Sequence, residues 1–219
     1  MSNVSIPEIR INFSWLLYHD VSAKLAEYEG WELPSVDDCE KWTNNYRHEW
    51  TKISDKVLTA MQDISGLQFK NSVYDVSTVP GVIAKSDPLV INFKDYPKET
   101  MSTLIHELIH VLLTDNTVLS LKGDERDFRL ADEWEKLFGF GDDFDALVHV
   151  PVHAIHRKIY ETVLNNPKMV DADREEMNQN NAESYIKSWE YVKNEGADVI
   201  IEKLKNSYAE IAKNLEKKK

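Results

Sequence analysis

Residues 103–114, Thr-Leu-Ile-His-Glu-Leu-Ile-His-Val-Leu-Leu-Thr, limit the possible folds of this chain more than any other stretch. Apolar residues recur there at steps of three and four, which predicts an α-helix with one face buried in a core. The predicted apolar stripe comprises Met101, Leu104, Ile105, Leu108, Ile109 and Leu112. The only ionisable residues of the stretch are His106, Glu107 and His110. Burying such groups is costly unless they are paired or bind a metal, so the stretch predicts a core helix that carries a polar site.

The three ionisable residues have the pattern H-E-x-x-H. Side chains four residues apart on a helix lie about 5 to 6 Å from each other, so His106 and His110 can share one metal ion. Glu107 is rotated about 100° from His106, which places its carboxylate beside the metal rather than on it. Neutral imidazole suits zinc, and three protein ligands leave a fourth position for water, whose pKa falls to about 7. Glu107 would then act as general base on this zinc-bound water.

The same pattern resembles the zinc-binding helix of the zincin metallopeptidases. Thr103 stands three residues before the first histidine, and uncharged residues surround the motif, as in that superfamily. The resemblance implies that His106 and His110 are zinc ligands, that Glu107 is the catalytic base, and that the substrate is a peptide or protein. It covers about a dozen of the 219 residues and leaves the family open. The bland alternative is a chance match inside an amphipathic helix.

A second group of histidines follows in a predicted helix over residues 143–164, which is kinked at Pro151 or begins there. We expect His153 of this helix to be the third zinc ligand, with His149 as the alternative. His149 can instead donate to the oxyanion of a tetrahedral intermediate. His156, next to an arginine, is expected to be solvated or to support a ligand. Tyr160 is a candidate donor to the intermediate or a buried structural residue.

Carboxylates offer further candidates for the third ligand. A thermolysin-like arrangement would take a glutamate from a downstream helix, and an aspzincin-like one would take an aspartate, although its flanking pattern is missing. These candidates are Glu133, Glu135, Asp142 and Asp143. A metzincin-like arrangement is set aside, because it requires glycine and histidine where Leu113 and Asn116 stand.

The remaining patterns predict an α+β fold that is mostly helical. A short extended piece and a helix are expected within residues 9–30, and one long amphipathic helix within 35–66, with its aromatic stripe in the core. A small β-sheet precedes the metal helix, and the resemblance implies that its last strand could pair with an extended substrate. We expect a zincin-like domain over residues 1–166 and a helical C-terminal extension over 167–219. The predicted strands are residues 73–80, 81–84 and 89–93; the other helices are 126–138, 171–195 and 197–215.

Composition excludes some classes of partner. The formal net charge of −12 argues against nucleic acid and anionic membrane surfaces. No uninterrupted apolar stretch approaches the length of a membrane span, and no basic leader precedes an apolar run. Cys39 is the only cysteine, so no intrachain disulfide forms and a cytoplasmic location is expected, with Cys39 as a buried thiol. The sequence does not decide the oligomeric state.

Three rivals to a zinc metallopeptidase stay open at this level. The first is a zinc-stabilised binding or interaction protein without turnover, which a site closed by four protein ligands would favour. The second is a metal-free helical structural protein, in which the histidines are satisfied core groups. The third is a metal enzyme that acts on something other than peptide bonds.

Overall fold

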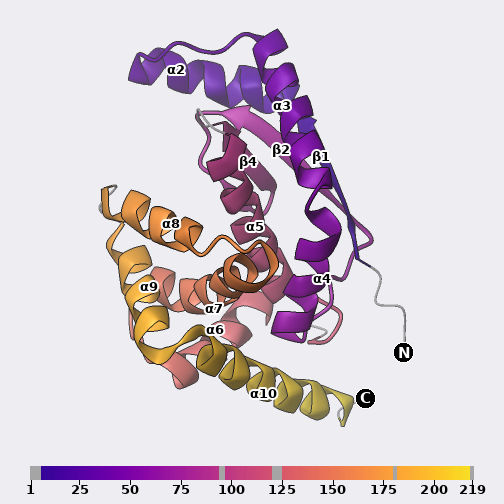
Figure 1. The fold of residues 1–219 in the computed structure, drawn as a ribbon, viewed down its shortest axis with the longest axis vertical. Helices are drawn as coiled ribbons and strands as arrows, with labels where there is room; N and C mark the ends of the chain where they lie inside the picture. Colours follow the sequence, from indigo (N-terminus) through magenta and orange to yellow (C-terminus); the bar gives the residue numbers. More distant parts are fainter. Residues whose placement is uncertain (1–5, 94–96, 120–124, 180–181, 218–219) are drawn as a thin grey trace. The chain divides into compact units, whose positions relative to one another are not determined.

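The chain forms an α+β fold that is mostly helical and contains one small sheet, which confirms the predicted fold class (Figure 1). The computed structural model describes residues 6–93, 97–119, 125–179 and 182–217. Contacts group the chain into two compact units. The sheet unit comprises residues 1–58 and 71–111, and the helical unit comprises residues 59–70 and 112–219. This is a different partition from a division after residue 166, which stays a prediction.

The sheet unit is built on four strands in the order β1-β2-β4-β3. The strands are β1 (Glu8–Phe13), β2 (Val73–Pro80), β3 (Lys85–Ser86) and β4 (Leu89–Phe93). The first two pair in parallel, β4 runs parallel to β2, and β3 is antiparallel to β4. Between β1 and β2 the chain forms α1 (Trp15–Leu17), a π-helical turn (Tyr18–Ser22), α2 (Ala23–Glu29), α3 (Val36–Thr51) and α4 (Ser54–Ser65). Helix α3 packs on β1 and β2, above a core of β-branched side chains that include Ile11, Val76 and Ile91.

One predicted strand is wrong. Residues 81–84 form a connection, and only the two residues of β3 extend the sheet beyond it. Gly81 has φ 74°, and a Cβ there would lie 2.5 Å from the Trp31 ring, so the local geometry requires glycine. Because β3 pairs with Leu89 and Val90, β4 is not an edge strand over those residues, and an added peptide strand cannot pair with them there.

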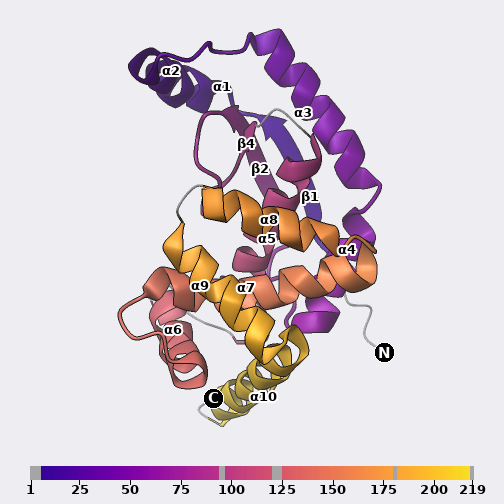
Figure 2. The same ribbon diagram turned by 60° about the vertical axis from the view of Figure 1, so that its left-hand side comes forward.

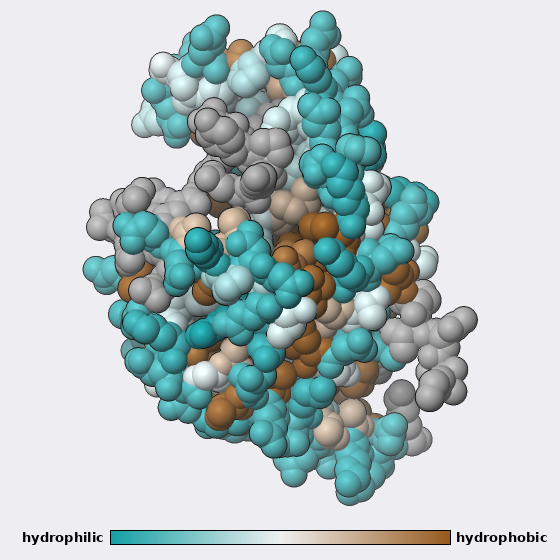
Figure 3. All heavy atoms as spheres, in the orientation of Figure 1, coloured by the Kyte–Doolittle hydropathy of each residue, from teal (hydrophilic) through white to brown (hydrophobic). Residues whose placement is uncertain are grey.

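The long helix predicted over residues 35–66 is two helices, α3 and α4. The N–H groups of Lys52 and Ile53 bond to carbonyls three residues earlier, and this tighter turn separates the two helices. The start was predicted correctly, because the Ser35 hydroxyl accepts a hydrogen bond from the Asp38 N–H and caps α3. Hydrophilic residues cover the outward face of α3 (Figure 3). The predicted stripe is largely buried, as seen at Cys39, Tyr46, Trp50, Val57 and Met61.

The helical unit is arranged around α7 (Phe144–Lys158), which continues as a π-helical turn, Ile159–Val163. Helices α6 (Glu125–Phe138), α9 (Glu183–Glu195) and α10 (Ala197–Glu216) pack on α7, and α8 (Lys168–Gln179) packs on α9 (Figure 2). Pro151 lies inside α7, so a helix start at this proline is wrong, whereas the predicted span of 143–164 is confirmed. Within the described part of the chain, no helix has the length and apolar character needed to cross a bilayer.

Candidate metal centre

The helix that carries the H-E-x-x-H pattern is α5 (Pro97–Thr114). It starts at a proline, which has no N–H to lose at the first position of a helix. Its apolar stripe is buried, since Leu104, Ile105, Leu108, Ile109 and Leu112 have no solvent exposure. His106 and Glu107 are also buried, with 7% and 8% of their surface exposed. The expected core helix with embedded ionisable groups is therefore present.

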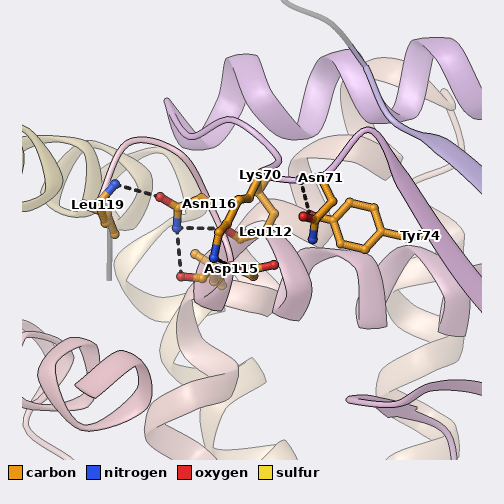
Figure 4. Close-up of polar contacts among 8 residues, drawn as sticks. Lys70, Asn71, Tyr74, Leu112, Asp115, Asn116 and Leu119 are labelled. Atoms are coloured by element: carbon orange, nitrogen blue, oxygen red, sulfur yellow. Dashed lines mark hydrogen bonds and ion pairs between the residues drawn. The ribbon is translucent and has the colours of Figure 1, made fainter. Parts of the chain in front are cut away.

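The C-terminal end of α5 is closed by Asn116 (Figure 4). The Asn116 side-chain amide donates to the carbonyls of Leu112 and Leu113, at 3.1 and 3.3 Å, and its oxygen accepts from the Leu119 N–H at 2.9 Å. Next to it, the Lys70 ammonium pairs with Asp115 at 2.9 Å. These bonds satisfy helix carbonyls that would otherwise have no partner. Asn116 therefore has a structural role, in agreement with the exclusion of a metzincin-like arrangement.

The two α5 histidines converge through their Nε2 atoms. These atoms lie 3.2 Å apart, and the ring centroids lie 4.9 Å apart with 62° between the ring planes. Two imidazole nitrogens bound tetrahedrally to zinc, each at about 2.0 to 2.1 Å, would be about 3.3 Å apart. The spacing of His106 and His110 fits a shared metal without rearrangement. In the metal-free chain, one Nε2–H can donate to the other nitrogen.

Glu107 lies in the same turn of α5 as His106. Burial raises the pKa of this carboxyl to about 7, because the charged form loses its hydration. A group with this pKa exchanges its proton near neutral pH, which is the range in which a general base is most effective. The position and environment of Glu107 therefore fit the role predicted for it.

His149 of the helical unit is the alternative third ligand, and its own surroundings are well defined. The Nδ1–H of His149 donates to the backbone carbonyl of Asp145, which makes Nε2 the nitrogen that carries the lone pair. Burial also lowers the pKa of His149, so its neutral form is favoured. A neutral imidazole held by a carbonyl at its other nitrogen is the usual state of a histidine that binds zinc.

His153, the expected third ligand, is held differently. Its side chain is fully buried. Its Nδ1 lies 2.9 Å from the Ser188 hydroxyl, and its ring stacks on Trp189 at 4.0 Å with 6° between the planes. The carbonyl bond of His149 is typical of a zinc-binding histidine, whereas the ring of His153 is stacked in the core of the helical unit.

The carboxylate candidates for the third ligand all lie in the helical unit. Glu133 pairs with Lys136, and the Glu135 carboxylate accepts the N–H groups that follow α6. Asp143 caps α7 and pairs with Lys187 at 2.8 Å, and Asp142 is exposed. Each of the first three carboxylates has a structural partner, which accounts for its position without a metal.

The last two sequence candidates lie further along α7 and its π-helical turn. A solvated His156 is wrong, because 1% of its surface is exposed and burial lowers its pKa to about 3. Its ring lies 5.0 Å from that of Tyr160. Tyr160 is also buried, which agrees with the structural alternative for this residue. Both side chains belong to the core of the helical unit.

Sequence reasoning missed the residues of α9 that hold the α7 histidines. The Tyr185 ring lies 3.9 Å from that of His149, and Trp189 and Ser188 hold His153. The signal that was present is the spacing of these three residues on one face of a predicted helix. Nothing in that spacing indicates which upstream residues they contact.

Comparisons with protein-family models, with curated proteins and with solved structures find no match to this chain. The functional argument therefore rests on the residues of the candidate metal centre.

Proposed function

We propose that the protein is a zinc-dependent hydrolase of peptide bonds. The observation that carries this proposal is the 3.2 Å separation of the Nε2 atoms of His106 and His110 on one helix. Buried histidines with converging nitrogens are the donors that zinc prefers. The H-E-x-x-H pattern, which resembles that of the zincins, supports peptide hydrolysis among the possible reactions.

In this proposal His106, His110 and His149 hold the metal, and His153 is the other candidate for the third position. Three protein ligands leave one coordination position for water or substrate, as in catalytic zinc sites. Zinc bound there would supply a water of lowered pKa and Lewis-acid polarisation of a substrate carbonyl. The Asp145 carbonyl keeps the Nδ1–H tautomer of His149, so that its Nε2 faces a metal as a neutral donor.

Glu107 moves the proton. Its carboxylate accepts a proton from the attacking water and later donates it to the nitrogen of the leaving amine. Burial raises the pKa of Glu107 to about 7, so both transfers occur without a large mismatch in proton affinity. A bound cation would favour the carboxylate form and so poise Glu107 as a base.

The first test is metal content. Protein purified without chelator or nickel resin is analysed by plasma mass spectrometry, beside alanine variants of His106, His149, His153 and Glu133. We expect about one zinc per chain, lost in the His106 and His149 variants and retained in the other two. If the wild-type chain neither holds zinc nor takes it up, the proposal is wrong and the metal-free structural rival stands.

Hydrolysis is tested separately with a quenched peptide library, with and without chelator. We expect cleavage that stops when zinc is removed and returns when it is restored. Stoichiometric zinc without cleavage of any peptide would favour the zinc-stabilised binding protein instead.

We also propose a reducing compartment, the cytoplasm, as the site of action. The only cysteine, Cys39, is buried, and burial raises the pKa of its thiol to about 11. Such a thiol is a packing residue rather than half of a disulfide or a nucleophile. The expected partner is a peptide or protein substrate.

A further inference from the structure

In the helical unit, side chains of helix α9 contact His149 and His153 of helix α7. Helix α9 was expected to belong to a C-terminal extension with no assigned role. Its residues Tyr185, Ser188 and Trp189 face α7 and contact two of its histidines. These contacts combine a stacked ring pair with a hydrogen bond.

His149 is restrained from two directions. Along its own helix, Nδ1 is bonded to the Asp145 carbonyl one turn earlier. On the α9 side, the Tyr185 ring lies 3.9 Å from the imidazole, tilted by 39°, and its centroid is 5.5 Å from the ring of His153. A ring at this distance restricts rotation of the imidazole on that side. The carbonyl bond thus favours the Nδ1–H tautomer, and the Tyr185 ring restricts the orientation of His149.

The backbone of Tyr185 is joined to His153 through the Ser188 hydroxyl. The Ser188 hydroxyl donates to the Tyr185 carbonyl at 2.8 Å and lies 2.9 Å from His153 Nδ1. Because that hydroxyl has one proton, His153 Nδ1 must carry the hydrogen in the contact between them. The Trp189 ring stacks on the His153 ring, and its indole N–H donates to Asp173 on α8, at 3.0 Å. His153 is thereby an anchor for α9.

We propose that Tyr185 is a positioning residue for the metal centre, which holds the His149 imidazole with its Nε2 directed to the metal, and that His153 anchors the helix that carries Tyr185. The inference rests on the proposed function for the identity of the metal. It assigns α9 to the metal centre as a supporting element. Groups that orient a ligand in this way typically change metal affinity about 10- to 100-fold when they are lost.

The experiment compares Tyr185→Leu, Tyr185→Phe and Tyr191→Leu in the full chain by zinc titration against a chromogenic chelator. Tyr191 is the matched control, because it lies on the same helix and packs on Phe138 and Phe140, at 5.9 and 5.3 Å. We expect the zinc dissociation constant to rise about 10- to 100-fold in Tyr185→Leu alone. Tyr185→Phe keeps the ring and should bind like the wild type. An unchanged affinity in Tyr185→Leu would overturn the proposal.

A metal-free readout separates this proposal from the proposed function. The orientation of the His149 ring is measured by NOEs from its ring protons in chelator-treated protein, with circular dichroism to show that each variant is folded. We expect one ring orientation in the wild type and in Tyr191→Leu, and averaged orientations in Tyr185→Leu, because the Tyr185 ring is lost. If the wild type binds no zinc but this difference is seen, the proposed function fails and the positioning role of Tyr185 stands. If His149 keeps one orientation in Tyr185→Leu, the positioning role fails.

Discussion

Helices α5 and α7 both carry two histidines four residues apart, yet the two pairs have different environments. In α5, the Nε2 atoms of His106 and His110 lie 3.2 Å apart. The ring centroids of the α7 pair, His149 and His153, lie 5.5 Å apart, compared with 4.9 Å for the α5 pair. Each α7 ring is held by its own partners. His149 is bonded to a carbonyl of its own helix, whereas His153 is stacked on a tryptophan of α9.

The comparison teaches that spacing on a helix brings two imidazoles near each other but does not assign them one role. The neighbouring element decides, because it supplies the partner that fixes each ring. Ser188 and Trp189 bind His153 into the core, and Tyr185 restrains His149 from the side. If this distinction holds, changes in α5 should affect chemistry and metal, whereas changes at His153 should affect the fold.

The largest effect is expected at Glu107. In Glu107→Gln the amide cannot accept a proton, so hydrolysis should fall about 10²- to 10⁴-fold while zinc stays bound. Initial rates on a cleaved library peptide are measured beside the zinc content. Glu133→Gln, a change in a carboxylate that pairs with Lys136, is the control and should keep its rate. A Glu107→Gln protein that binds zinc and keeps full activity would falsify the base role.

The next effect separates the two helices directly. His153→Ala removes a fully buried, stacked ring, so the free energy of unfolding of the metal-free protein should fall by about 2 to 4 kcal/mol. Zinc should still bind, with the lower affinity expected when α9 loses its anchor. His110→Ala should do the reverse, with zinc lost and metal-free stability nearly kept. Urea unfolding in chelator and metal analysis measure the two quantities. Loss of zinc in His153→Ala with an unchanged unfolding midpoint would transfer the third-ligand role to His153.

A pH dependence is expected from His156, the third histidine of α7. Its pKa falls from an ordinary 6.5 to about 3 on folding, because burial disfavours the charged form. Below pH 6.5 the unfolded chain therefore binds a proton that the folded chain does not. Stability should be complete above pH 6.5 and should fall by about 1.4 kcal/mol per pH unit as the pH drops toward 3.

The measurement is urea unfolding between pH 6.5 and 4.5 in wild type, His156→Gln and His48→Gln. The part of the pH dependence of the unfolding free energy that comes from His156 should vanish in His156→Gln. It should remain in His48→Gln, because His48 is exposed. Glu107 acts in the opposite direction in the metal-free chain, since its raised pKa lowers stability as the pH rises from about 4.5 to 7. Equal slopes in His156→Gln and wild type would show that His156 takes up its proton without unfolding.

The sequence contained enough information to predict the local part of this comparison. Periodic apolar residues predicted α5 and the span of α7, Ser35 predicted the start of α3, and a lone cysteine on an apolar stripe predicted a buried thiol. The H-E-x-x-H spacing predicted two imidazoles close enough to share a metal. Each of these features depends on residues fewer than about five positions apart, where helical geometry determines the distances.

The parts that could not be predicted depend on distant residues. His149 and His153 have different partners in α9. These partners, Tyr185, Ser188 and Trp189, lie more than thirty positions downstream. The strand predicted over residues 81–84 has the β-branched content of a strand, but Gly81 turns against Trp31 and the chain pairs only at β3. Tertiary contacts overrode local preference at these places.

The smallest expected effect concerns how α7 begins. The Asp143 carboxylate accepts the Ala146 N–H at 3.2 Å and pairs with Lys187 of α9 at 2.8 Å, so it links the two helices that hold the histidines. The Lys187 and Ser184 hydrogen bonds and the Ala146 N–H lower the pKa of Asp143 to about 2. Its contribution is present above its ordinary pKa near 3.8 and is lost as the pH falls through 2. Asp143→Asn should lower the melting temperature by a few degrees at pH 7. Asp142→Asn, an exposed neighbour, should leave it unchanged, and an equal shift in both variants would mean that net charge, rather than the cap, is responsible.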